Sequence, residues 1–178
     1  MIQIADPEVT EEVLQSLSDE EKEELIKKYP ELAPIFTDWK VGRSLNLSEC
    51  TLTSLPEGLK VGWDLWLSGC TSLPCLPEGL EVGGNLHLGG CTGLTCLPEG
   101  LKVSGNLHLG GCTGLTCLPE GLKVGGYLCL EGCTSLTSLP EGLKVDGNLD
   151  LFGCTSLPYK KKSDLPCKKG IKGRVYWE

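Results

Sequence analysis

Aromatic side chains, histidine and methionine are scarce in this sequence, and long apolar runs are missing. Phe, Trp and Tyr make up 6% of the 178 residues, so the hydrophobic core has to be built from aliphatic side chains and cysteine. No apolar run approaches the roughly 18 residues that a membrane-spanning helix needs, and we expect no membrane partner. The N-terminal string MIQIADPEVTEE has neither the basic nor the apolar region of a signal peptide.

Basic side chains are too few for a general nucleic-acid-binding protein. The chain has 16 Lys and Arg against 24 Asp and Glu, a formal net charge of −8, whereas nucleic-acid binding needs a basic footprint. The 11 cysteines are an odd number, and without a secretory signal we expect them to be reduced thiols of a cytoplasmic protein. Delivery into a host cell stays open.

One short motif recurs along most of the chain. The string LPEGL begins at Leu55, Leu76, Leu97, Leu118 and Leu139, in steps of 21 residues. One valine and one cysteine of each repeat recur with the same spacing of 21 residues, and a first copy that is one residue shorter precedes them. This pattern predicts six repeats over residues 41–158, flanked by an N-terminal segment (1–40) and a C-terminal segment (159–178).

The length of the repeat predicts a β-rich solenoid. About 21 residues are too few for two helices per repeat. Leu86 and Leu88 alternate with His87, which is typical of a strand with one buried face. The Leu-Pro-Glu-Gly string is typical of a tight turn. We therefore expect parallel strands stacked about 4.8 Å apart, with extended return segments and little or no helix on the convex side.

The string L-x-L-x-G-C-x-x-L-x-x-L-P resembles a leucine-rich repeat. The period of about 21 residues and the LPEGL return resemble the short bacterial class of these repeats, which occurs in some secreted effectors. The resemblance covers residues 41–158 and neither end. It implies a protein-binding module, and an effector-like or host-interacting role if the effector resemblance holds.

The two ends differ in composition and charge. Residues 7–29 are expected to form helices that cap the first coil, with Pro7 at the first helical position and a capping box of Ser18 and Glu21 before the second helix. Residues 1–40 have a net charge of −7 and residues 159–178 of +5, and Val175–Trp177 is expected to close the last coil. Association between the acidic and basic ends gives a structural, self-associating alternative, so the chain is expected to be a monomer or to associate weakly.

Residues between the two strand leucines point away from the core and vary between repeats, while the scaffold positions hardly change. A variable surface on a constant scaffold favours specific binding of a protein partner through the concave face. The residues predicted to bind this partner are Trp63, Asp64, Trp66, His87, His108, Tyr127, Cys129, Glu131, Asp150 and Phe152.

A zinc-binding stripe is a third hypothesis. His87, His108 and Cys129 would lie on neighbouring strands and offer imidazole and thiolate ligands. Side chains on a flat ladder run parallel, however, and no CxxC spacing is present, so an ordinary polar stripe without a cofactor is favoured. No catalytic motif is present, and the protein is not expected to be an enzyme.

The cysteines fall into two columns. The column that follows the strands is expected to turn inward as compact apolar side chains: Cys50, Cys70, Cys91, Cys112, Cys133 and Cys154. The second column precedes LPEG and consists of Cys75, Cys96 and Cys117, with Ser54 and Ser138 at the equivalent positions. Partial exposure is expected for this second column, and its redox state stays open.

Overall fold

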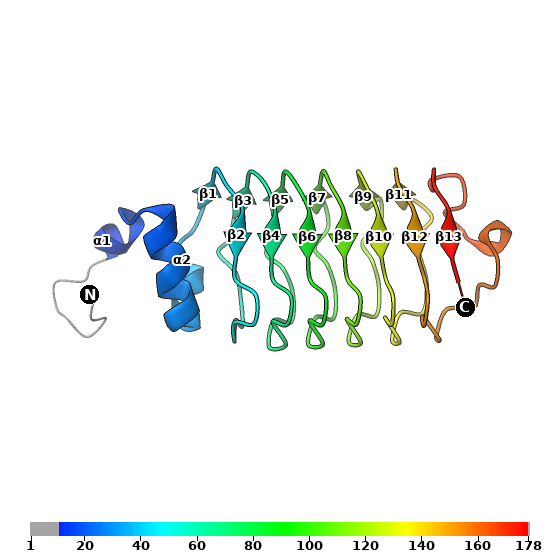
Figure 1. Ribbon diagram of the computed structural model, residues 1–178, viewed down its shortest axis with the longest axis horizontal. Coiled ribbons are helices and arrows are strands. Elements are labelled where there is room, and N and C mark those ends of the chain that lie inside the picture. Colours follow the sequence, from blue (N-terminus) through cyan, green and yellow to red (C-terminus); the bar gives the residue numbers. More distant parts are fainter. Residues whose placement is uncertain (1–10, 178) are drawn as a thin grey trace.

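The chain forms a parallel β-solenoid, which confirms the architecture that the repeat predicted. The computed structural model describes residues 11–177. Figure 1 shows short strands stacked side by side between a helical N-terminal segment and the C-terminal residues. Equivalent residues pair in register at the repeat period, as in Val61–Val82 and Leu86–Leu107. Between residues 40 and 161 the structure contains strands and turns but no helix.

Each coil contributes one two-residue strand to each of two parallel sheets. Sheet A consists of β1 (Lys40–Val41), β3 (Lys60–Val61), β5 (Glu81–Val82), β7 (Lys102–Val103), β9 (Lys123–Val124) and β11 (Lys144–Val145). Sheet B consists of β2 (Leu45–Asn46), β4 (Leu65–Trp66), β6 (Leu86–His87), β8 (Leu107–His108), β10 (Leu128–Cys129), β12 (Leu149–Asp150) and β13 (Val175–Tyr176).

Sheet B is the sheet that the sequence predicted, and sheet A is an addition. The leucine of each sheet B strand is fully buried and the next residue is partly or fully exposed, except in β13, which starts with a valine. In sheet A a lysine or glutamate points outward and a valine inward. Two-residue strands are too short to show the alternation that identifies a strand, so one strand per repeat was expected where the structure has two.

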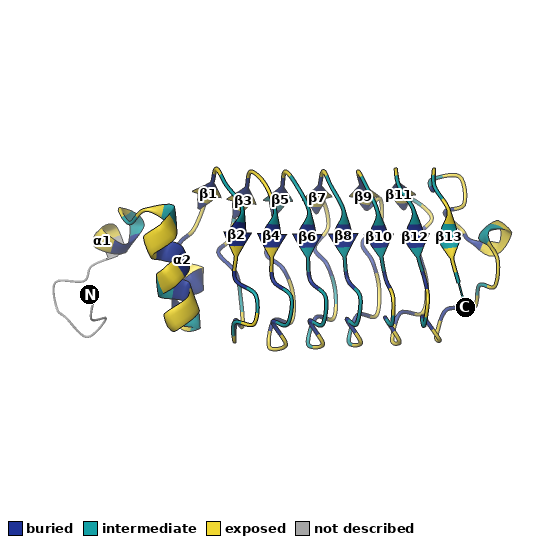
Figure 2. Ribbon diagram, viewed as in Figure 1, coloured by how far each residue is buried: buried dark blue, intermediate teal, exposed yellow. Residues whose placement is uncertain are grey.

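The core is a set of aliphatic columns that run the length of the solenoid. Figure 2 shows buried segments that recur at equivalent places in successive coils. One such column contains Leu45, Leu65, Leu86, Leu107, Leu128 and Leu149, all with no exposed surface. Since a single coil leaves both faces of its leucines open, only stacking of neighbours buries them. Each buried leucine contributes about 1.5–3 kcal/mol.

The inward cysteine column also matches the prediction. From the second coil onward its thiols are buried, and each donates a hydrogen bond of 3.0–3.2 Å to a leucine carbonyl of the preceding coil. Cys50, in the first coil, is only half-buried. Burial raises the pKa of Cys70 and of Cys112 to about 12. These thiols therefore stay protonated and serve as packing groups.

The N-terminal segment folds as α1 (Glu11–Gln15), α2 (Asp19–Lys28) and the 3-10 helix η1 (Pro30–Ile35). The predicted capping box is confirmed: Ser18 accepts a hydrogen bond from the Glu21 amide, and the Glu21 carboxylate accepts one from the Ser18 amide. Tyr29 caps the C-terminus of α2, at the end of the predicted helical range 7–29. The expected helix start at Pro7 lies outside the described residues.

The N-terminal helices contact the first coil through both apolar and charged groups. Ile26 and Phe36 are completely buried and belong to the same core cluster as the first leucines. Arg43 forms ion pairs with Glu20 (2.9 Å) and with the buried Glu23 (2.8 Å). Burial raises the pKa of Glu23, but the hydrogen bonds and charges of Lys27 and Arg43 outweigh it, so the net pKa is lowered.

The C-terminal segment returns to the solenoid and adds one strand. Residues 159–171 include the 3-10 helix η2 (Lys162–Asp164), and β13 then pairs in parallel with β12, with Asp150 opposite Tyr176. The expected last strand is therefore confirmed. No helix within residues 11–177 is long and apolar enough to cross a lipid bilayer.

Candidate functional site

The outward residues of sheet B line up in one column along the solenoid. We call the surface around this column the sheet B face. Its members come from the second residue of each strand: Asn46, Trp66, His87, His108, Cys129, Asp150 and Tyr176. Because the strands are parallel and in register, these side chains project from neighbouring coils at the strand spacing of about 4.8 Å.

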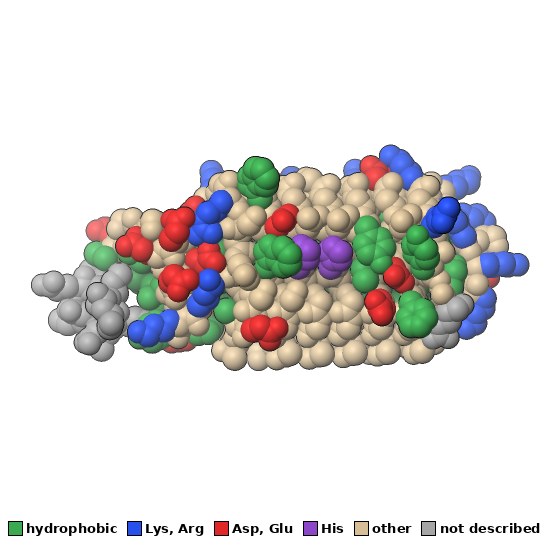
Figure 3. All heavy atoms as spheres, viewed as in Figure 1, with side chains coloured by type: hydrophobic (Ala, Val, Ile, Leu, Met, Phe, Trp, Pro, Cys, Tyr) green, Lys and Arg blue, Asp and Glu red, His purple; other side chains and the backbone are tan. Residues whose placement is uncertain are grey.

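The rings in the column stack on one another. The ring centroids of Trp66 and His87 lie 3.7 Å apart with planes 4° from parallel, and those of His87 and His108 lie 4.7 Å apart at 5°. Tyr127 ends the row with an edge contact to His108 at 5.9 Å. Figure 3 shows the two histidines in this row between hydrophobic side chains. In-register pairing of planar side chains at the strand spacing is the physical cause of this stack.

The stack lowers the basicity of both histidines. The pKa of His87 is lowered by burial of its ring and by the neighbouring His108, while the carboxylate of Asp64 opposes the shift. Burial also lowers the pKa of His108. The Nε2 atom of His87 is buried without a hydrogen-bond partner among the described residues. The two rings are therefore neutral at pH 7 and behave as flat, weakly polar surfaces.

Tyr127 anchors the other end of the row. Its hydroxyl donates a 2.7 Å hydrogen bond to Oδ2 of Asp150, whose Oδ1 accepts a 3.0 Å bond from the Phe152 amide. Burial and the hydrogen bond to Asp150 raise the pKa of Tyr127, so the phenol stays protonated. Asp150 is thus held between two donors, and this end of the sheet B face has a defined shape.

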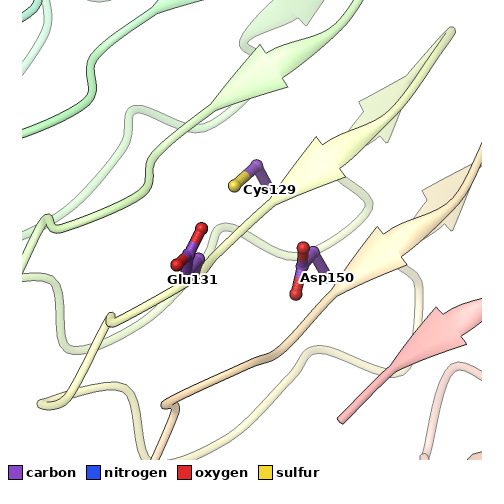
Figure 4. A group of neighbouring side chains, drawn as sticks. All are labelled: Cys129, Glu131 and Asp150. Atoms are coloured by element: carbon purple, nitrogen blue, oxygen red, sulfur yellow. The ribbon is translucent and has the colours of Figure 1, made fainter.

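The structure brings together a different group of metal-binding side chains from the one predicted. Ligand atoms of Cys129, Glu131 and Asp150 all lie within 4.8 Å of one another (Figure 4). His87 and His108 instead stack with parallel planes, and their nitrogen lone pairs lie in those planes, so the rings do not converge on one ion. Carboxylates often gather on an exposed face without a metal, so the cluster alone does not define a metal centre.

Asp64 belongs to a structural ladder beside the column. Its Oδ1 accepts a 2.7 Å hydrogen bond from the Asn85 amide, and the side chains of Asn85 and Asn106 accept equivalent bonds from the next coil. These side chains link neighbouring backbones where the regular sheet pairing stops. The predicted partner-binding residue Asp64 therefore has a structural task in this fold.

Large apolar side chains are exposed in the stack and in the segments next to sheet B strands. Trp63 is 67% exposed, Phe152 52% and Trp66 39%. Tyr176, 42% exposed, extends the column by one coil and was missed by the sequence analysis. Its surrounding sequence departs from the repeat, so no sequence signal aligned it with the other members. The remaining predicted residues Glu131 and Asp150 lie beside Cys129, as described above.

No family model matches this sequence, and searches of curated proteins and of solved structures find no match either.

Proposed function

We propose that the coils are leucine-rich repeats of the short bacterial type and that the protein binds another protein through the sheet B face. The in-register leucine columns, the inward cysteine column and the period of about 21 residues support the assignment of the repeats. The N-terminal helices act as the cap that a solenoid needs over its first coil. A bacterial origin and delivery into a host cell remain predictions from the resemblance.

The observation that supports binding is the aromatic and imidazole row on the sheet B face. Only 6% of the residues are aromatic, yet Trp63, Trp66 and Phe152 are exposed on the surface, where their rings add little to the hydrophobic core. Exposed aromatic side chains on a rigid sheet are typical anchors of protein interfaces, because they bury large areas at little cost in side-chain entropy. Rings already locked in a stack lose even less freedom on binding.

Acidic side chains at one end of the row favour a partner that is partly apolar and partly basic. The acidic side chains of Glu131 and Asp150 lie at one end of the row, next to the exposed ring of Phe152. An aromatic anchor beside a carboxylate suits a partner surface with an apolar pocket next to a basic side chain.

The experiment is quantitative cross-linking mass spectrometry with matched variants. Trp63→Ala/Trp66→Ala removes two proposed anchors. Lys123→Ala/Lys144→Ala is the control, because it truncates two exposed side chains of sheet A instead. Circular dichroism first checks that both variants are folded. A partner that is cross-linked to the wild type and to the sheet A variant, but at least tenfold less to the tryptophan variant, supports the proposal. Equal cross-linking to both variants contradicts it.

Self-association through the charged ends is the second candidate. Figure 3 shows Lys and Arg side chains gathered at the C-terminal end and acidic side chains over the N-terminal helices. Some of these charges already have intramolecular partners: Lys172 pairs with Asp146, and Lys162 donates to two backbone carbonyls. Light scattering tests this candidate. Oligomers at low salt that dissociate at high salt support it, and a monomer at low salt contradicts it.

A further inference from the structure

Three thiols form a column on the return segments, away from the strands of sheet B. Cys75 and Cys117 are exposed and Cys96 is half-buried, and all three are free cysteines. They occupy the same position, immediately before LPEG, in three consecutive coils. The column therefore presents three accessible sulfur atoms from a rigid, repeating backbone.

Backbone hydrogen bonds hold the three thiols in register. The Thr95 amide donates to the Pro74 carbonyl at 3.0 Å, and the Thr116 amide donates to the Thr95 carbonyl at 3.1 Å. These bonds join the residues directly before each cysteine, so neighbouring coils approach at the strand spacing of about 4.8 Å. The hydroxyl of the preceding threonine lies 3.9 Å from the sulfur in both Cys96 and Cys117. The sulfur atoms of Cys96 and Cys117 thus have equivalent surroundings, whereas Cys75 follows Pro74 and shares only the backbone register.

This column differs chemically from the inward column. From the second coil onward the inward thiols are buried and their S–H groups donate to backbone carbonyls, so a ligand from solvent does not reach them. Cys75 and Cys96 instead line a surface groove together with Glu57, Glu78 and Glu99. Three carboxylates beside thiols give this groove a negative field that attracts cations.

We propose that neighbouring thiols of this column bind a soft monovalent cation of the Cu(I) type between two thiolate sulfurs. A metal–thiolate bond of about 2.3 Å, taken from zinc sites, gives an in-line S–metal–S span of roughly 4.6 Å. The column spacing of about 4.8 Å matches this span. Zinc requires four ligands around a tetrahedron, which a linear column does not provide, whereas thiolates favour Cu(I).

Binding exchanges protons for the metal without a redox step. Two S–H bonds break, two Cu–S bonds form, and both protons pass to solvent, so the bound group carries one negative charge. Cys96 has a neighbouring thiol on each side, whereas Cys75 and Cys117 are two coils apart, about 9.6 Å. The site therefore requires Cys96 together with either of its neighbours.

The test titrates the reduced protein with the Cu(I)–bicinchoninate complex under anaerobic conditions. The loss of colour measures the Cu(I) that the protein withdraws. Cys96→Ser is expected to lower this uptake at least tenfold, while Cys75→Ser and Cys117→Ser each retain it. Serine already stands at the equivalent positions 54 and 138, so the fold accepts this substitution. Cys50→Ser, a half-buried thiol outside the column and outside the sheet B face, is the matched control and keeps the uptake.

A rescue variant tests whether uptake requires any two thiols on neighbouring coils or Cys96 itself. Ser54→Cys in the Cys96→Ser background places a thiol one coil before Cys75 and is expected to restore the uptake. Uptake that survives Cys96→Ser, or that Ser54→Cys fails to restore, overturns the proposal, as does a wild-type protein that withdraws no Cu(I). The column does not belong to the sheet B face, so these results are independent of the proposed partner binding.

Discussion

Single residues decide how each coil turns after its sheet B strand. Gly69, Gly90, Gly111, Gly132 and Gly153 have φ between 68° and 75°. In the first coil Glu49 takes the same position with φ of 59°. A side chain in this left-handed region costs about 1–2 kcal/mol because its Cβ crowds the following carbonyl oxygen. The repeat therefore keeps glycine at this turn.

Gly111→Ala is expected to lower the free energy of unfolding by about 1–2 kcal/mol. An added Cβ at this position meets no atom closer than 3.6 Å, so the loss reports backbone strain rather than a clash. Gly42→Ala is the control, because Gly42 lacks a positive φ and has open space around it. Urea denaturation measures both. Equal stability of the two variants would show that the turn conformation is not strained.

The stacked histidines make stability depend on pH. Both imidazoles have a folded-state pKa below the ordinary value of 6.5, mainly through burial. The unfolded chain therefore binds more protons as the pH falls below about 6.5, and the free energy of unfolding decreases. Above that pH both states are neutral, and this contribution to stability is fully present.

Urea midpoints measured from pH 7.5 to 5.5 check this expectation. The midpoint of the wild type is expected to fall over this range. His87→Asn/His108→Asn is expected to flatten the profile, and the first coil already has Asn46 in this column. An unchanged slope in the double variant would assign the pH dependence to other groups.

At the scale of elements, ion pairs fix helix α2 against the first coil. Glu23 is buried and pairs with Lys27 at 2.9 Å and with Arg43 at 2.8 Å, whereas Glu20 pairs with Arg43 from an exposed position. A buried, doubly paired carboxylate is held more firmly than an exposed one, which salt and water screen.

Glu23→Ala is expected to loosen α2 by about 1 kcal/mol, because Arg43 and Lys27 both lose their buried partner. Hydrogen exchange of the α2 amides measures this opening, and exchange is expected to accelerate about fivefold or more. Glu20→Ala is the matched control and should leave the rates nearly unchanged. If the two variants exchanged alike, the apolar contacts of Ile26 and Phe36 would hold the helix on their own.

At the scale of the whole molecule, stability comes from stacking of near-identical neighbours. Every strand pairs only with the strands one coil away, so the solenoid has no long-distance contact that a missing coil would break. Deletion of residues 92–112 removes one full period and joins Cys91 to Thr113, which restores the native Cys-Thr junction.

This deletion variant is expected to fold into a solenoid shorter by about 4.8 Å, with lower stability because one interface between coils is lost. Small-angle scattering and circular dichroism check length and fold. Deletion of residues 92–101, about half a period, is the control and is expected to unfold the chain, since it places polar positions in the leucine columns. A half-period variant that kept its fold would contradict a stacked-column core.

Much of the candidate site followed from the repeat alignment, and some of it did not. The outward column from Trp66 to Asp150 could be predicted because strand side chains alternate. The second sheet escaped prediction because its strands are two residues long. Tyr176 escaped because its segment departs from the repeat, and the structural task of Asp64 was hidden because it depends on an amide of the next coil.

The sequence alone determined the solenoid, its period and the inward or outward direction of each strand residue, since these depend on spacing along one chain. The tertiary structure decided which side chains meet between coils. The ring stack of Trp66, His87 and His108 and the hydrogen bond from Tyr127 to Asp150 join residues at least 20 positions apart. Such contacts depend on the register of stacked coils, which only the folded backbone sets.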